Sequence, residues 1–272
     1  MAETIPARTM DKSKDDGIFI RKVIVNYRKN GRHNLPWRKK ATPYNVLVSE
    51  IMLQQTQVVR VLEKYNVWMK KYPSLRALKK ATLKDVLHVW KGLGYQRRAK
   101  ALYDIAQQIT EVPTTFEKLV LLPSVGMYTA TAVMAFAHNT FSYPMLETNI
   151  RTAIIDTYYS KKKKVSDETI REDVTRLEKN TLVKKIGARV WYSALMDYGA
   201  MLKEHNISHN TKSTSYVKQT SYKGSTRQLR AKVLFSFVEE KPLPKDKRVS
   251  SILTSLSKEG LIRKEGKGYV IA

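Results

Sequence analysis

The sequence predicts a mainly α-helical protein with a small C-terminal module of helices and strands. Apolar residues recur at spacings of three and four along most of the chain, as they do in helices with one buried face. Short breaks with proline or glycine separate these stretches. The helical stretches are residues 18–27, 44–69, 83–90, 97–109, 116–121, 128–137, 149–159, 167–180 and 186–201.

The two ends of the chain differ from this pattern. Residues 1–16 are polar and charged, so we expect a flexible arm. Residues 203–225 are rich in hydroxyl and basic side chains and predict a linker. Residues 226–272 contain two amphipathic stretches, at 226–239 and 248–259, and then two short apolar runs around a glycine turn. Helix, helix and hairpin predict a winged-helix-like module, which binds either DNA or protein.

Composition favours a nucleic-acid partner. The 272 residues include 42% hydrophobic residues, enough for one sizeable core and a small second domain. The chain has 50 Lys and Arg against 24 Asp and Glu, a formal charge of +26, which attracts polyanions. A generally lysine-rich composition is the alternative explanation.

Several classes of protein are excluded. No apolar run approaches the ~20 residues that span a bilayer, and the N-terminus lacks the apolar core of a signal peptide. We therefore expect a cytoplasmic protein, nucleoid-associated in a prokaryote, with no membrane partner. The absence of cysteine excludes disulfides and a cysteine-held iron–sulfur cluster, and the three histidines of the C-terminal half are too few to predict another metal. No cofactor is expected; these histidines are His138, His205 and His209.

A tight turn at residues 123–126 joins two helical stretches and predicts a helix-hairpin-helix. The N–H groups at the start of the second helix can hold a DNA phosphate without reading base sequence. Gly126 is expected to supply a positive φ or a close approach. Without further signals, the same pattern fits any helical corner.

Glu147 stands directly before a predicted helix, with Asn149 two residues later. An acid in this place is most often a helix cap. If the hairpin delivers DNA beside it, the same carboxylate can stabilise positive charge that develops on a deoxyribose as a base leaves.

Five motifs follow one another in the order of a known family. They are LPWR at 35–38, TPYNVLVSEIMLQQTQV at 42–58, GLGYQRRAKAL at 92–102, LPSVGMYTA at 122–130 and ALMDYGAML at 194–202. Over residues 18–201 the chain resembles the adenine DNA glycosylases of the MutY type. They belong to the helix-hairpin-helix superfamily, together with endonuclease III and mismatch thymine glycosylases. The resemblance implies a two-lobed glycosylase core over residues 17–202.

The resemblance also implies an activity and a catalytic set. The activity is base excision repair, in which adenine opposite 8-oxoguanine or guanine is removed from double-stranded DNA; we expect a monomer. Glu50 would be the general acid, in a closed pocket that raises its pKa. Glu147 would stabilise the sugar cation. Tyr128 replaces the lysine of the lyases, which implies a monofunctional enzyme. Asn149 and Arg38 would orient water, sugar or the carboxylates.

Simpler interpretations exist for these residues: Glu50 could be an exposed helix acid, Tyr128 a core residue and Arg38 a surface cation. The resemblance assigns DNA contact to three segments, which supply a wedge, an intercalating loop with phosphate contacts, and the hairpin. The alternatives are solvated helix positions and a charged helix face. The DNA-contacting set is Gln54, Gln55, Thr56, Leu93, Gly94, Tyr95, Arg97, Arg98, Ser124, Val125, Gly126 and Thr129.

The chain departs from the family at four points. Lys203 and His205 stand where most members begin the cysteines of a [4Fe–4S] cluster. Glu147 is one methylene longer than the usual aspartate, which moves the charge by about 1 Å. Ser124 replaces the first hairpin glycine. The winged-helix-like tail stands where longer relatives carry a domain that reads 8-oxoguanine.

Two other functions stay open. A mismatch glycosylase that removes thymine or uracil opposite guanine shares Tyr128, but needs less protonation of its leaving base than adenine does. A non-catalytic protein that binds damaged DNA is consistent with the altered Glu147 and the tail.

Overall fold

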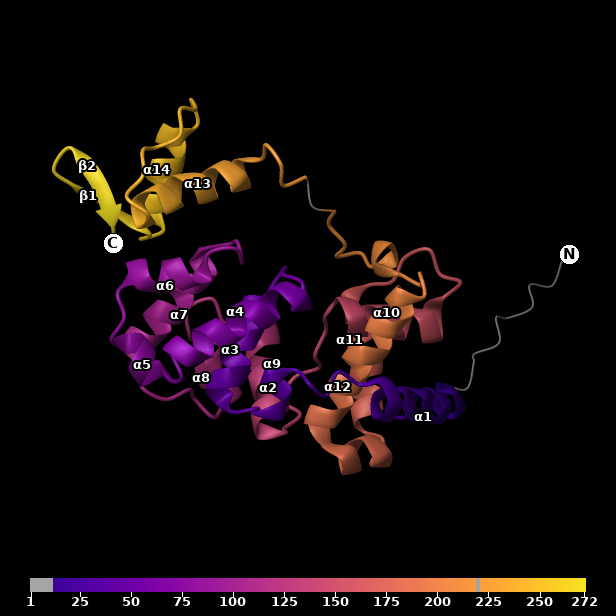
Figure 1. Ribbon diagram of the computed structural model, residues 1–272. Coiled ribbons are helices and arrows are strands. Elements are labelled where there is room, and N and C mark those ends of the chain that lie inside the picture. Colours follow the sequence, from indigo (N-terminus) through magenta and orange to yellow (C-terminus); the bar gives the residue numbers. More distant parts are fainter. Residues whose placement is uncertain (1–11, 219–220) are drawn as a thin grey trace, which may run out of the picture. The chain divides into compact units, whose positions relative to one another are not determined.

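The computed structural model describes residues 12–218 and 221–272 and is mainly helical, which confirms the predicted fold class (Figure 1). The described chain divides into two compact units, one of residues 12–33 and 139–216 and the other of residues 34–138 and 217–272. No described helix is long and apolar enough to cross a membrane.

The first unit contains α1 (Lys12–Asn30), α10 (Thr148–Tyr159), α11 (Asp167–Glu178), α12 (Thr181–Glu204) and the short 3-10 helix η1 (Asn210–Lys212). α1 and α10 both pack on α12. Phe19, Ile154 and Trp191 are among the fully or almost fully buried side chains of its core.

The prediction of a flexible arm over residues 1–16 is wrong for its last five residues. Residues 1–11 lie outside the described residues, but Lys12–Asp16 already belong to α1. The side chain of Asp16 accepts a 2.7 Å hydrogen bond from the Tyr158 hydroxyl. This contact extends the helix in the N-terminal direction, and polar composition alone does not reveal it.

The second unit contains eight helices before its C-terminal module: α2 (Pro36–Lys39), α3 (Pro43–Leu53), α4 (Val58–Lys71), α5 (Leu75–Lys79), α6 (Leu83–Trp90), α7 (Arg97–Gln108), α8 (Phe116–Leu119) and α9 (Met127–His138). The predicted stretch 44–69 is two helices, because the chain turns at residues 54–57, where Gln55 has a φ of 55°. Apolar spacing continues on both sides of the turn and therefore hides it.

The C-terminal module consists of α13 (Thr226–Val238), α14 (Val249–Lys258), β1 (Ile262–Glu265) and β2 (Gly268–Ile271). The two strands pair antiparallel, with Ile262 opposite Ile271. The predicted order of helix, helix and hairpin is confirmed. The module belongs to the second unit, where α13 packs on α6.

Candidate functional site

α3 carries Glu50 in a buried position. Thr42 caps the helix by accepting a 3.2 Å hydrogen bond from the Asn45 N–H, and Pro43 occupies its first turn. Glu50 is 5% exposed, and the adjacent Ile51 and Met52 are fully buried. The interpretation of Glu50 as an exposed helix acid is therefore wrong. A carboxyl removed from water in this way usually serves a purpose.

Arg98 closes the end of the same helix. It is only 5% exposed, and its Nη1 donates to the carbonyls of Ile51 (3.0 Å) and Met52 (2.9 Å). These carbonyls lie in the last turn of α3, where no intrahelical donor is available. Burial lowers the pKa of Arg98 to about 10. The predicted phosphate contact of Arg98 is wrong, because the guanidinium is enclosed by protein carbonyls.

The guanidinium of Arg98 also connects the two loops predicted to contact DNA. Its Nη2 donates to the carbonyls of Leu93 (2.9 Å) and Gly94 (3.2 Å), and to Oγ1 of Thr56 at 3.0 Å. Oγ1 of Thr56 also donates to the Leu93 carbonyl at 3.3 Å. The loop after α3 and the loop before α7 therefore form one hydrogen-bonded structure.

The two loops present their side chains unequally. Gln55 is exposed and Tyr95 is half-buried, and both have left-handed backbones, with φ of 55° and 45°. Leu93 is 3% exposed, so its side chain packs in the core of this structure and its intercalating role stays a prediction. Trp90 Nε1 donates to the Gly94 carbonyl at 2.9 Å, within the turn that places Leu93 in the core.

The hairpin lies between α8 and α9. The positive φ of this turn is at Ser124 (58°), so of the two roles predicted for Gly126, a positive φ or a close approach, only the second stays open. Val125 is 4% exposed and its N–H donates to the Leu122 carbonyl at 3.1 Å, so its contact with DNA stays a prediction that the free structure does not favour. Gly126 is exposed, and no atom lies within 4 Å of a Cβ added there. Gly126 therefore leaves room for a phosphate at the start of α9.

Of the remaining predicted residues in this unit, Thr129 is the most deeply buried. It is 2% exposed, and its Oγ1 accepts a 3.4 Å hydrogen bond from Nε2 of Gln54, so it positions Gln54 in this structure. Tyr128 is half-buried on α9 and Arg38 is half-buried on α2. Arg97 is exposed at the start of α7.

In the first unit, Glu147 caps α10. Its Oε1 accepts hydrogen bonds from the N–H groups of Asn149 (2.8 Å) and Ile150 (2.9 Å), and its Oε2 accepts one from the Thr148 hydroxyl (3.1 Å). The capping interpretation is confirmed. These bonds also fix the carboxylate at a helix N-terminus, where the helix dipole stabilises a negative charge.

Lys203 joins this end of α10 and was not identified as a site residue from the sequence. It lies in the last turn of α12, and its Nζ donates to Oδ1 of Asn149 at 2.6 Å. Gly199, four residues earlier, allows the approach, because a Cβ there would lie 2.0 Å from the Asn149 carbonyl oxygen. Burial lowers the pKa of Lys203, and the charge of Glu147 opposes this shift.

The segment after Lys203 does not fit an iron–sulfur cluster. The chain has no cysteine, and the described residues contain no group of three or more potential metal-ligating acids and histidines. The segment instead contacts α10, since His209 Nε2 lies 2.9 Å from Asp156 Oδ1 and the Thr152 hydroxyl donates to Asn210 Oδ1 at 3.2 Å. Residues 203–216 therefore pack onto the first unit.

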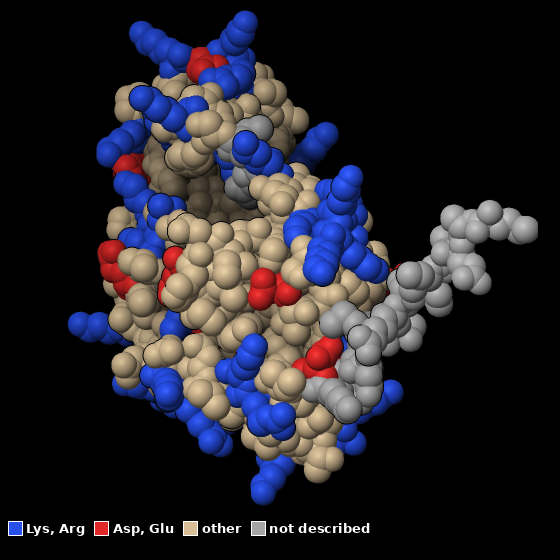
Figure 2. All heavy atoms as spheres, turned by 90° about the vertical axis from the view of Figure 1, so that its right-hand side faces the viewer, with Lys and Arg blue, Asp and Glu red and all other residues tan. Residues whose placement is uncertain are grey.

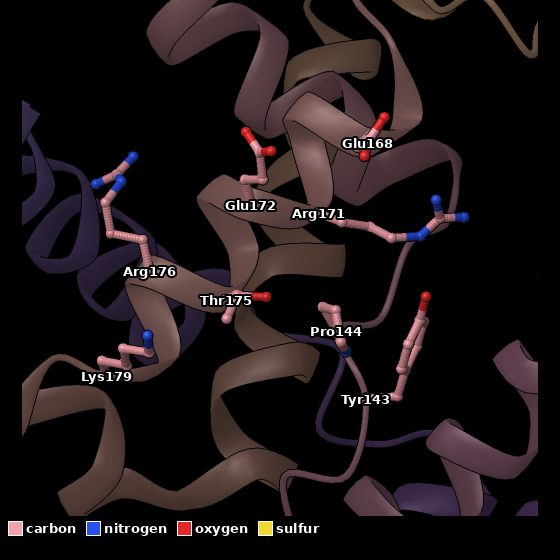
Figure 3. A pocket seen from close by; sticks show the side chains of 8 residues that line it. All are labelled: Tyr143, Pro144, Glu168, Arg171, Glu172, Thr175, Arg176 and Lys179. Carbon is pink, nitrogen blue, oxygen red and sulfur yellow. The ribbon is translucent and has the colours of Figure 1, made fainter.

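A pocket of about 550 Å³ lies elsewhere in the first unit, between Tyr143 and Pro144 and the side chains of α11 and its C-terminal end (Figure 3). It contains none of the predicted site residues. Arg176, one of its lining residues, forms ion pairs with Asp16 and Asp173. The lining combines carboxylates and cations and does not resemble the predicted site.

Comparison with known proteins identifies the family. Residues 48–179 match the family model described as HhH-GPD superfamily base excision DNA repair protein. The adenine DNA glycosylase of Buchnera aphidicola subsp. Acyrthosiphon pisum is 35% identical over 191 residues, which cover 68% of this chain and 53% of the relative. That of Mycobacterium tuberculosis strain CDC 1551 is 41% identical over 138 residues, 48% of this chain and 45% of the relative. The chain therefore spans about half the length of these relatives.

A solved structure supports the fold. The structure of a thermostable thymine-DNA glycosylase superposes with a TM-score of 0.63 at 23% identity, covering 74% of this chain and 93% of that one. The segment matched by the family model includes Glu50, the hairpin and Glu147. The chain belongs to the HhH-GPD superfamily of base excision DNA repair proteins.

Proposed function

We propose that the protein is a monofunctional DNA glycosylase that hydrolyses the N-glycosidic bond of adenine paired with 8-oxoguanine or guanine. The observation that carries the proposal is Glu50, a carboxyl that is 5% exposed on α3 within the segment matched by the family model. The names of the relatives in Buchnera aphidicola and Mycobacterium tuberculosis support adenine as the target.

In the proposed reaction, Glu50 protonates a ring nitrogen of adenine, so that the base leaves as a neutral molecule. The glycosidic bond breaks and positive charge develops on the deoxyribose. Glu147, held in one orientation by its capping hydrogen bonds, stabilises that charge. Water then adds at the sugar carbon and gives up a proton to the Glu50 carboxylate or to solvent, which completes the hydrolysis. Tyr128 offers no amine for a covalent adduct, so the product is an abasic site in an intact strand.

The proposed DNA contacts are made by predicted residues that are exposed or half-buried in the structure. Gln55 and Tyr95 are the candidates to fill the space left by an extruded base, because they sit on loops with fixed, left-handed backbones. The start of α9 at Gly126 is the candidate phosphate site. On the face of the molecule in Figure 2, Lys and Arg side chains are far more widespread than Asp and Glu, which suits a polyanionic partner.

A matched pair of variants tests the role of Glu50. Single-turnover adenine release is measured for the unmodified protein, for Glu50→Gln and for Glu63→Gln, which neutralises an exposed acid on α4. Release that is lost in Glu50→Gln and unchanged in Glu63→Gln supports the proposal. A protein that releases thymine or uracil, and is only weakened by Glu50→Gln, is a mismatch glycosylase. A protein that binds mispaired DNA tightly and releases no base is a damage sensor.

A further inference from the structure

The C-terminal module separates its charges. Residues 221–272 contain five acidic and twelve basic residues. Each of the five acids lies in an ion pair; they are Glu239, Glu240, Asp246, Glu259 and Glu265. The module therefore has no acidic side chain without a cationic partner, and its surplus charge is entirely positive.

Three of these acids face the rest of the second unit. Glu240 accepts a 2.5 Å hydrogen bond from Lys84, and Glu239 pairs with Lys91, which also lies 5.7 Å from the centre of the Phe235 ring. Glu259 lies 3.6 Å from the guanidinium of Arg97. The acids of the module thus dock it on the basic surface of α6 and the start of α7.

The opposite chemistry is presented by α14 and the hairpin. Ser250, Thr254 and Lys258 are exposed and lie four residues apart, so they form one stripe along α14. Lys264 and Lys267 are exposed on β1 and in the hairpin turn. None of these three lysines belongs to an ion pair of the described residues. The neighbouring carboxylates of Glu259 and Glu265 pair with Arg230 and Arg263 instead, so hydroxyl side chains and these lysines form a surface that a phosphate backbone can approach.

The module is also continuous with a loop that is proposed to contact DNA. Arg227, in the first turn of α13, donates to the Tyr95 hydroxyl at 3.1 Å. Tyr95 belongs to the loop that Arg98 joins to the end of α3. A duplex that reaches this loop would therefore lie beside the C-terminal module.

We propose that the module is a second DNA-binding surface, which holds the phosphate backbone of duplex DNA through Lys258, Lys264 and Lys267. The inference rests on the proposed function only in taking duplex DNA as the partner. The contact is electrostatic and independent of base sequence, so it adds affinity for undamaged and mispaired duplexes alike.

The test measures binding to an undamaged duplex over a range of salt concentrations. The variant changes Lys258, Lys264 and Lys267 to glutamine. The matched control also changes three lysines to glutamine. They are Lys70, Lys79 and Lys80, which are exposed on α4 and at the end of α5 and form no ion pair among the described residues. Because the changed side chains are exposed, both variants should fold, which circular dichroism checks.

The logarithm of the association constant K falls as the logarithm of the salt concentration rises. For the module variant we expect this negative slope to become smaller in magnitude by about 2–3, and the affinity to become about 10–100-fold weaker. The control should change little. Equal effects of the two variants, or an unchanged slope in the module variant, would overturn the inference and leave a protein-binding role for the module. Adenine release by the unmodified protein is measured in parallel. If the unmodified protein releases no adenine but the module variant has a weaker salt dependence, only the proposed function is refuted. If adenine is released but the salt dependence of the module variant is unchanged, only this inference is refuted.

Discussion

Replacing Arg98 by methionine should destabilise the second unit strongly. Methionine keeps most of the apolar length of the side chain but removes the hydrogen-bond donors. The carbonyls of Ile51 and Met52, at 3.0 and 2.9 Å from Nη1, then lose the charged donor that closes α3. The favourable contact between a cation and the C-terminal end of that helix is lost as well.

The magnitude follows from the number of carbonyls affected. A buried carbonyl left without a donor costs about 1–3 kcal/mol, and Ile51 and Met52 are both affected. The carbonyls of Gln54, Leu93 and Gly94 are affected less, because the Thr56 hydroxyl can still donate to one of the first two and Trp90 Nε1 to the third. Relief from burying a guanidinium offsets part of the loss.

We therefore expect a decrease of about 3–5 kcal/mol in the free energy of unfolding, measured by urea denaturation. The melting temperature should fall by roughly 10 °C. Arg98→Lys should recover part of this, because an ammonium can donate to one or two of the same carbonyls. Arg97→Met, at an exposed neighbouring position, is the control and should change the free energy of unfolding by less than about 1 kcal/mol. A stability of Arg98→Met within about 1 kcal/mol of the unmodified protein would refute the reasoning.

Three further predictions concern the first unit. Glu147→Gln keeps an oxygen to accept from the N–H of Asn149 but removes the charge, so the rate of base release should fall at least ~100-fold. Calorimetry should show nearly the same melting temperature as for the unmodified protein. An unchanged rate of release would contradict the catalytic role. Lys203→Met should slow single-turnover release about tenfold by freeing the Asn149 side chain, with little change in duplex affinity; a loss confined to affinity would contradict this. Asp167 has a pKa lowered from 3.8 to about 2, chiefly by hydrogen bonds from Arg151. The ionised Asp167 stabilises the fold above pH 4, and this stabilisation is lost as the pH falls toward 2. Thermal melts should therefore show Asp167→Asn less stable than the unmodified protein by about 1–2 kcal/mol at pH 7 and about equally stable near pH 2. A stability difference that stays constant with pH would exclude this linkage.

The sequence predicted the regular elements well and the loops poorly. Apolar spacing identified most helices, and the order helix, helix and hairpin in residues 226–272 is confirmed. Spacing reports which face of a helix is buried, but it carries no information on a loop. The burial of Leu93 and Arg98 results from contacts between the segment after α3 and the segment before α7, separated by about 40 residues in sequence.

The candidate site shows the same division. Burial of Glu50 followed from its apolar neighbours in VLVSEIML, and the capping role of Glu147 followed from its place before a helix. The contact of Lys203 with Asn149 joins residues 54 positions apart and leaves no local pattern. At the hairpin, the left-handed position falls on Ser124, a residue type that gives no sign of positive φ.

The most direct test of the proposed function is single-turnover base release by the unmodified protein from four duplexes. These carry adenine opposite 8-oxoguanine, adenine opposite guanine, thymine opposite guanine and uracil opposite guanine. The proposed chemistry at Glu50 predicts release of adenine from the first two duplexes, with the strand left intact until alkali cleaves the abasic site. Release of thymine or uracil alone, or no release from any of the four, would contradict it.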